Sequence, residues 1–524
     1  MTPGSLLWHP FRARAEGAPE RTALVAGGDR LTYGELHARS NGVARLLVDA
    51  GVEPGDRVVL FLPKGLDALV ALFGILKAGA AYVPVASNQP AVRSATIIGD
   101  ADVRAVVTDA AAWRSVAPSL STEALAVVLW SGPAPEGGAD GVASATLADV
   151  EGITAAPDVA ASADGPAYVL YTSGSTGVPK GVVLSHGNAR AFADWGVETF
   201  SLGPDDRLSA HAPLTFDLST FDFFAGLSSG ASVHLVPARF RAFPGALADW
   251  IAAEALTTWY SVPTAISQMT ERDPPPGHDF EHLRTMLFAG EVFPVARLRR
   301  AMGVFRHARF YNLFGPTETN VCTYYPVPRP FPGDADTVPI GSVCCGDVAE
   351  IRDDDGRALP DGEVGELVVC GPTVMQGYLN RPAINAERLT DPIPPFGTRA
   401  YRTGDMVWRD AGGLLYYSGR RDSMVKTRGY RVELGEVERA LEAHDTVRQA
   451  AVVAVPDPAI GARLVAFVVP SEQPPSTADL LRHCAACLPR HALPESLHVL
   501  EDLPLTDRGK VDRQGLVADA RSRA

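Results

Sequence analysis

The sequence predicts an α/β fold with a large N-terminal domain and a small, mobile α+β C-terminal domain. In the N-terminal domain we expect two mostly parallel sheets with flanking helices, plus a small β-rich subdomain. Short apolar runs alternate with helix-length segments through residues 58–288, a pattern typical of parallel sheets covered on both faces. Over residues 336–419 the residue pattern changes and predicts short strands separated by Gly/Pro/Asp turns. A chain of 524 residues with 46% hydrophobic residues can bury more than one core.

The first β-α-β unit is predicted within residues 31–85. Apolar residues from Leu36 to Leu47 recur on one helical face, and a Gly/Pro segment at 51–55 ends this helix. We then expect a strand at 58–62, a helix at 68–77 and a strand at 81–85.

Later elements follow the same reasoning. Further buried strands are predicted at 105–108, 126–130, 232–236, 257–261 and 285–288, and a β-rich strand at 364–370. Near the end of the chain we expect a helix at 437–441, strands at 450–455 and 464–469, and a helix at 478–488. The predicted domain division is 1–420 and 421–524.

Bulk composition narrows the class of protein. The formal charge of −14 and the lack of a basic block argue against nucleic acid as a partner. No apolar run is long enough for a membrane span, and the first thirty residues carry charges throughout, so we expect a cytoplasmic protein. Cys484 and Cys487 have the spacing of a redox or zinc pair, but no second pair completes a site. We therefore interpret these two cysteines as small residues on a helix and not as a redox or zinc site.

Residues 171–181 combine three glycines, four aliphatic hydroxyls and Lys180 directly after an apolar run. A strand that opens into such a loop presents N–H groups and hydroxyls to an anion. The order of residues differs from a Walker A loop, because a proline separates Gly177 from Lys180. This segment therefore predicts a polyphosphate cradle.

Three later segments also combine charged and polar residues in a way that is unusual for segments with only a structural role. Residues 312–318 place a carboxylate, a hydroxyl and an amide around a Gly-Pro turn, and residues 401–405 place an acid at a turn. Residues 419–429 are charged and bounded by glycines. Together and in order, these segments closely resemble the adenylation domains of nonribosomal peptide synthetases, within the superfamily shared with acyl-CoA synthetases and luciferases. The resemblance runs from Leu31 to Arg513.

The resemblance implies a two-step reaction. An amino acid carboxylate attacks the α-phosphate of ATP, which yields an aminoacyl-adenylate and pyrophosphate. The thiol of a phosphopantetheine arm on a carrier protein then attacks the adenylate, which yields a thioester and AMP. Catalysis of this kind rests on positioning and on electrostatic stabilisation of phosphate charge.

The resemblance also implies roles for individual residues. The β- and γ-phosphates are expected at Thr172, Ser173, Gly174, Ser175, Thr176, Gly177 and Lys180. Thr317 is expected at the α-phosphate, Glu318 at Mg²⁺, Asn312 and Phe314 at the adenine, and Asp405 at the ribose with Arg420 nearby. Phe314 replaces a commoner tyrosine, so only apolar packing is expected from it. Lys510 is expected to bridge the substrate carboxylate and the α-phosphate, with Asp422 as the hinge of a rotating C-terminal domain.

The substrate pocket implied by the resemblance contains Asp217, Leu218, Phe221, Tyr260, Leu287, Ala289, Leu313, Val321 and Cys322, besides Lys510. Asp217 corresponds to the residue that pairs with an α-amino group, and a buried ammonium needs such a partner. The rest of the lining is apolar and favours a small amino acid. The set resembles that of free-standing enzymes that load L-proline onto a carrier protein in pyrrole and antibiotic biosynthesis. Valine and an aryl glycine such as hydroxyphenylglycine are the alternative substrates.

Expected partners follow from motifs that are missing. No carrier segment follows Arg513 and no condensation motif occurs, so we expect a free-standing enzyme whose carrier acts in trans. The rival interpretations are an acyl- or aryl-CoA ligase, which does not need Asp217, a non-catalytic ATP-binding regulator and a plain ATPase.

Overall fold

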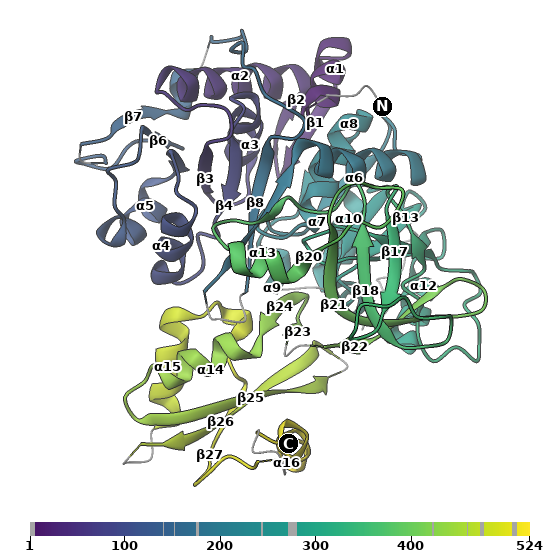
Figure 1. Cartoon of the computed structure of the whole chain (residues 1–524). Helices are drawn as coiled ribbons and strands as arrows, with labels where there is room; N and C mark the ends of the chain where they lie inside the picture. Colours follow the sequence, from purple (N-terminus) through teal and green to yellow (C-terminus); the bar gives the residue numbers. More distant parts are fainter. Residues whose placement is uncertain are drawn as a thin grey trace.

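The chain forms a large layered N-terminal part and a smaller C-terminal unit that lies against it (Figure 1). A computed structural model describes residues 6–139, 141–150, 152–173, 178–242, 245–270, 280–421, 424–457, 459–471, 476–505 and 511–523. None of the described helices combines the length and apolar character needed to cross a membrane.

Nine described strands form the first large sheet. Its central pairs are parallel, and antiparallel strands lie toward both edges. In spatial order the strands are β16 (Ser342–Val343), β15 (Thr323–Pro326), β14 (Arg309–Phe314), β13 (Thr285–Phe288), β12 (Thr258–Ser261), β10 (Arg207–Ala210), β11 (Ser232–Leu235), β1 (Thr22–Ala26) and β2 (Asp29–Thr32).

Eight described strands form the second large sheet, and most of its pairs are also parallel. The two exceptions are the antiparallel pairs that β9 makes with β8 and with β19. In spatial order the strands are β19 (Gly377–Tyr378), β9 (Lys180–Ser185), β8 (Pro166–Thr172), β4 (Ala81–Pro84), β3 (Arg57–Phe61), β5 (Ala105–Thr108), β6 (Val127–Trp130) and β7 (Ala143–Thr146).

Helices pack around the two sheets. Helix α2 (Tyr33–Asp49) begins with a capping box, in which the Thr32 hydroxyl accepts from the Glu35 N–H and the Glu35 carboxylate accepts from the Thr32 N–H. Helix α3 (Leu66–Lys77) packs closely on α2, since a Cβ at Gly74 would lie 2.5 Å from the Val43 side chain. The others are α1 (His9–Gly17), α4 (Ala91–Asp100), α5 (Ala110–Val116), α6 (His186–Thr199), α7 (Leu218–Thr220), α8 (Gly226–Ser229), α9 (Arg239–Ala242), α10 (Gly245–Ala253), α11 (Pro263–Thr270), α12 (Val295–Val304) and α13 (Pro382–Arg388).

A third sheet and the C-terminal unit complete the fold. The third sheet contains β17 (Val348–Arg352), β18 (Gly365–Cys370), β20 (Leu389–Thr390), β21 (Ala400–Arg409) and β22 (Leu415–Arg420). The C-terminal unit contains the hairpin β23 (Met424–Thr427) and β24 (Tyr430–Glu433), helices α14 (Leu434–Glu442), α15 (Thr477–Cys487) and α16 (Arg513–Ser522), and a sheet of β25 (Val447–Asp457), β26 (Gly461–Pro470) and β27 (Ser496–Val499).

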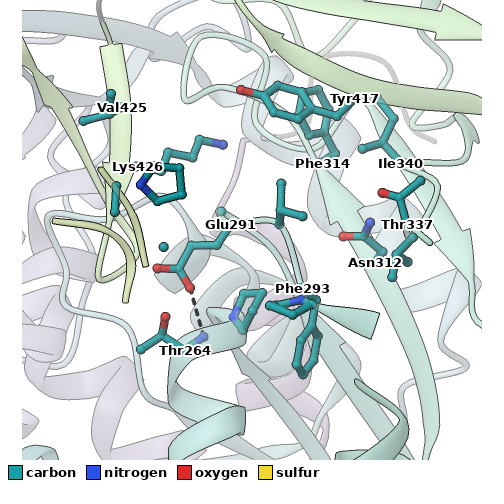
Figure 2. A pocket seen from close by; sticks show the side chains of 18 of the residues that line it. Thr264, Glu291, Phe293, Asn312, Phe314, Thr337, Ile340, Tyr417, Val425 and Lys426 are labelled. Carbon is teal, nitrogen blue, oxygen red and sulfur yellow. Dashed lines mark hydrogen bonds between the residues drawn. The ribbon is translucent and has the colours of Figure 1, made fainter. Parts of the chain in front are cut away.

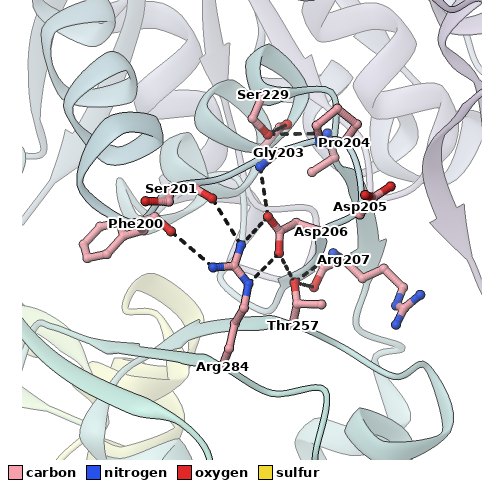
Figure 3. Close-up of polar contacts among 12 residues, drawn as sticks. Phe200, Ser201, Gly203, Pro204, Asp205, Asp206, Arg207, Ser229, Thr257 and Arg284 are labelled. Atoms are coloured by element: carbon pink, nitrogen blue, oxygen red, sulfur yellow. Dashed lines mark hydrogen bonds and ion pairs between the residues drawn. The ribbon is translucent and has the colours of Figure 1, made fainter.

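A polar cluster joins the amino ends of three strands in the first sheet (Figure 3). The buried carboxylate of Asp206, just before β10, accepts from the Thr257 hydroxyl at 2.6 Å and from the Arg284 Nε at 3.1 Å. Thr257 precedes β12 and Arg284 precedes β13. The cluster therefore ties these strands together at the edge opposite their carboxyl ends, which face the site described below.

The predicted fold class is confirmed, and most predicted elements agree within one or a few residues. The segment 105–108 is β5 and 285–288 is β13, while the predicted helix at 437–441 lies within the longer helix α14. Cys484 is buried and Cys487 half-buried on α15, and all six cysteines are free. Two features have no counterpart in the prediction. Strand β1 joins its sheet by parallel pairing with β11, and residues Phe221–Ala225 form a π-helical turn.

Candidate active site

The carboxyl ends of the central strands in the first sheet form one wall of the candidate site. Asp217 follows β10, Tyr260 lies in β12, Ala289 follows β13, and Asn312 lies in β14. Because the carboxyl ends of parallel strands meet at the same edge, residues far apart in sequence come together there. The hairpin β23–β24 of the C-terminal unit forms the facing wall.

Asp217 is a buried carboxylate with spare hydrogen-bonding capacity. It is 7% exposed, and among the described residues its Oδ1 atom has no hydrogen-bond partner. Burial raises the pKa of Asp217 to about 6, although the Thr317 hydroxyl and the Lys426 ammonium lower it. A cationic group is therefore the ligand that this carboxylate best accommodates.

A small cavity of about 50 Å³ opens beside Asp217. Five of the predicted substrate residues line it, namely Asp217, Leu218, Tyr260, Ala289 and Val321. Three others, Phe221, Leu287 and Cys322, are fully buried and are absent from the described lining, although the Phe221 ring packs edge-on against Tyr260 at 5.5 Å. Leu313 lines a larger neighbouring cavity instead. Apart from Asp217, the predicted substrate residues in this lining are apolar or aromatic, and Asp405, Arg420, Lys426 and Arg431 add charged groups.

Glu318 lies fully buried and is bound by two polar side chains. Its carboxylate accepts from the Tyr378 hydroxyl at 2.7 Å and from Arg431 at 3.0 and 2.9 Å. Burial raises the pKa of Glu318, but Arg431 and Tyr378 outweigh this and bring it to about 2. The carboxylate is therefore ionised at neutral pH. Among the described residues, no three His, Cys, Asp or Glu side chains gather as a metal site.

Asp405 and Arg420 form a buried ion pair between β21 and β22. The Arg420 guanidinium donates to Asp405 Oδ1 at 2.8 Å and to the Thr403 carbonyl at 2.9 Å. Their side chains are 3% and 7% exposed. Both residues line the small cavity, so the pair presents hydrogen-bonding groups to its contents.

The larger cavity, of about 610 Å³, lies between the two parts of the chain (Figure 2). Phe314 and Tyr417 pack with ring centres 5.9 Å apart on one side, and Asn312 Nδ2 donates to the Pro339 carbonyl at 2.8 Å. Lys426 of β23 lies 5.5 Å from the Phe314 ring centre. The two cavities share four lining residues, namely Gly290, Arg420, Met424 and Lys426. They are therefore neighbouring parts of one site.

The phosphate-loop residues are only partly described. Among the described residues, the buried Thr172 hydroxyl has no hydrogen-bond partner, and the Ser173 hydroxyl donates to the Arg431 carbonyl at 3.0 Å. Lys180 lies 5.3 Å from the Tyr378 ring centre, and burial lowers the pKa of this lysine. Gly174, Ser175, Thr176, Gly177, Asp422 and Lys510 lie outside the described residues.

Four residues of the site were not assigned a role from the sequence, namely Glu291, Tyr378, Lys426 and Arg431. Lys426 lies in the charged segment 419–429 and Arg431 two residues beyond it, and the sequence indicates a contact for neither residue. Burial lowers the pKa of Lys426, whereas Asp405 raises it. Tyr378 and Glu291 carry no composition signal of their own, so only their position in the fold identifies them.

Comparison with known proteins defines the class. Residues 11–379 match the AMP-binding enzyme family, and residues 436–510 match the AMP-binding enzyme C-terminal domain. This chain belongs to the AMP-binding enzymes.

Individual relatives lie within the same class. The chain is 40% identical over 498 residues to an L-proline--[L-prolyl-carrier protein] ligase of Pseudomonas fluorescens, covering 95% of this chain and 96% of the relative. It is 38% identical to a Streptomyces coelicolor protein of the same description, covering 95% and 94%. Among solved structures, the Vibrio cholerae adenylation domain AlmE in complex with glycyl-adenosine-5'-phosphate superposes with a TM-score of 0.83 at 25% identity, covering 98% of each chain.

Proposed function

We propose that this protein activates L-proline with ATP and transfers it to the phosphopantetheine thiol of a separate carrier protein. In the first step a carboxylate oxygen bonds to the α-phosphorus and pyrophosphate leaves. In the second step the thiol sulfur bonds to the acyl carbon, the bond to AMP breaks, and the thiol proton passes to solvent.

The buried carboxylate of Asp217 is the main evidence that the substrate is an amino acid. Its Oδ1 atom has no hydrogen-bond partner among the described residues, and the residue lines the small cavity together with the apolar and aromatic side chains of Leu218, Tyr260 and Val321. An ammonium in that cavity would supply the missing partner, whereas a fatty or aryl acid would leave the carboxylate unpaired. An acyl- or aryl-CoA ligase is therefore the weaker candidate.

Two observations support L-proline over other small amino acids. The two relatives described above are named for L-proline, at 40% and 38% identity over nearly their whole length. Leu218, Tyr260, Ala289 and Val321 enclose a compact space beside Asp217. A secondary ammonium still has two hydrogens to donate to Asp217. Because shape discriminates by only about 1–3 kcal/mol per methylene, valine and hydroxyphenylglycine are the competitors to test.

The remaining predicted residues receive roles in the same proposal. Asn312 and Phe314 would flank the adenine, Asp405 with Arg420 the ribose, and Thr317 the α-phosphate. Thr172, Ser173 and Lys180, with residues 174–177, would hold the β- and γ-phosphates. The first five of these residues support this arrangement, because they lie far apart in sequence but line the two joined cavities.

Glu318 is the residue that would hold Mg²⁺. Its ionised carboxylate fits a hard cation, which proteins commonly bind through one or two carboxylates, substrate phosphates and waters. In this arrangement both of its oxygens accept from Arg431, so the cation would share the carboxylate with the guanidinium or displace it. Bound Mg²⁺ would neutralise phosphate charge.

We further propose that the chain divides into two domains after residue 420. Asp422 would be the hinge, and rotation of residues 421–524 would bring Lys510 into the adenylate-forming site. The contact of Arg431 with Glu318 supports a C-terminal unit that engages the site directly. The carrier would act in trans. All six cysteines are free, which supports a reducing compartment such as the cytoplasm.

ATP–pyrophosphate exchange tests the proposal. The assay would compare the proteinogenic amino acids, hydroxyphenylglycine, benzoate and a short fatty acid. Exchange dominated by L-proline is the expected result. Dominance of another small amino acid would change the substrate, and exchange only with benzoate or the fatty acid would refute the role of Asp217. ATP hydrolysis without any acid would indicate a plain ATPase.

A further inference from the structure

Two adjacent thiols lie next to the wall of the small cavity. Cys345 Sγ donates to the Val321 carbonyl oxygen at 3.2 Å, and Cys344 Sγ lies 3.5 Å from Cys345 Sγ and 3.8 Å from the same carbonyl oxygen. Burial raises the pKa of Cys344 and of Cys345, so both thiols keep the hydrogen that a donor needs. Neither cysteine is among the described residues that line the cavity, so the pair can act on a ligand only through the residues in front of it.

The backbone holds this pair in an uncommon turn. The Asp347 N–H donates to the Cys344 carbonyl at 3.0 Å, and the two residues between them, Cys345 and Gly346, have φ angles of 58° and 81°. Turns with positive φ at both central residues favour Gly, Asn and Asp, because most side chains are strained at such a φ. A cysteine in this position points to a role for its side chain, and the contact of this thiol is with the cavity wall.

Two residues of the cavity wall lie close to the thiol pair. Val321 is held on both sides of its backbone, since its N–H donates to the Asn320 side chain at 3.0 Å while its carbonyl accepts from Cys345. Burial raises the pKa of Tyr260, and nearby acidic groups, the two thiols among them, raise it further. Tyr260 and Val321 both line the cavity of about 50 Å³. The thiols therefore limit how far these two residues can move away from a larger ligand.

We propose that Cys344 and Cys345 set the size limit of the substrate pocket, so that it admits a five-membered cyclic amino acid and disfavours the six-membered homologue. This inference rests on the proposed function, in which L-proline is the substrate. Both cysteines are positioning residues, because they contact the pocket wall and not the substrate. Protein interiors are packed closely enough to transmit the loss of one atom, and one methylene in an apolar pocket changes kcat/KM by about 10- to 200-fold.

The test measures pyrophosphate exchange with L-proline and with L-pipecolic acid, whose ring has one more methylene. Wild type should prefer L-proline. In Cys345→Ala the loss of the sulfur leaves space behind Val321, so the ratio of the two kcat/KM values should fall about tenfold. Cys345→Ser keeps a donor for the Val321 carbonyl and should keep the wild-type ratio. KM for ATP should stay at the wild-type value in both variants.

Cys484→Ala is the matched control, since Cys484 is another fully buried thiol, on α15 of the C-terminal unit, and it should leave the ratio unchanged. If Cys345→Ala does not fold, Cys344→Ala tests the same pair and should lower the ratio in the same direction. An unchanged ratio in the folded variant would overturn the inference and leave the proposed function intact, as would equal losses of exchange with both amino acids. Wild type that does not use L-proline would refute the proposed function, and this inference with it, before any variant is compared.

Discussion

Arg431 of the C-terminal hairpin donates to both carboxylate oxygens of Glu318, at 3.0 and 2.9 Å, although 113 positions separate them in the chain. Their side chains are 15% and 0% exposed. The ion pair places a guanidinium at the carboxylate that we assign to Mg²⁺. A cation bound at Glu318 would therefore share this carboxylate with Arg431 or displace the guanidinium.

Arg431→Ala should destabilise the protein, because it leaves the Glu318 carboxylate buried without its main partner. Breaking a buried ion pair should cost about 3 kcal/mol in the free energy of unfolding. The thermal unfolding midpoint measures this loss. Arg448→Ala is the control, since its pair with Asp502 is 53% and 80% exposed and should contribute little. Equal midpoints for both variants would mean that Arg431 does not hold Glu318 in solution.

Asp217→Ala should weaken use of the amino acid while ATP binding persists, because the substrate ammonium loses its counter-charge. We expect KM for the amino acid in pyrophosphate exchange to rise by about a hundredfold, as is typical when a buried charge loses its partner. Binding of ATP, measured by calorimetry, should match wild type. Unchanged amino acid activation would disprove the assignment of Asp217.

The pKa of Asp217, raised by burial to about 6, predicts a pH dependence. Below that pH the free enzyme carries a neutral carboxyl group, which cannot pair with an ammonium. The kcat/KM for the amino acid should thus be level above pH 6 and fall about tenfold per pH unit below it. Asp217→Asn should lack this step, and a step of the same size in that variant would assign it to another group.

Lys510→Ala should slow adenylate formation by about a hundredfold, the scale on which removal of one charge-stabilising donor acts. Binding of ATP should be unaffected. Transfer from a supplied prolyl-adenylate to pantetheine should also persist, because that step no longer needs charge stabilisation at the α-phosphate. Arg521→Ala, on the exposed side of α16, is the matched control. Exchange at the wild-type rate in Lys510→Ala would exclude this lysine from the reaction.

The sequence alone predicted the fold class, which the structure confirms, and it supplied the site residues as predictions, because both depend on local order. Alternation of apolar runs and helices indicates parallel sheets wherever it occurs. The residues around Glu318 and Asp405 lie in compact segments that their composition marks, whereas Asp217 is predicted only from the resemblance to adenylation domains. The structure then places these three segments around two joined cavities.

Only the tertiary structure decided which partners these residues meet. The bond of Arg431 to Glu318, the closeness of Gly461 to Glu291, and the pairing of β1 with β11 all join segments far apart in the chain. Hydrophobic periodicity reports which face of an element is buried, but not which distant element covers it. Burial also raises the pKa of Asp217, and burial depends on the packing of the whole chain.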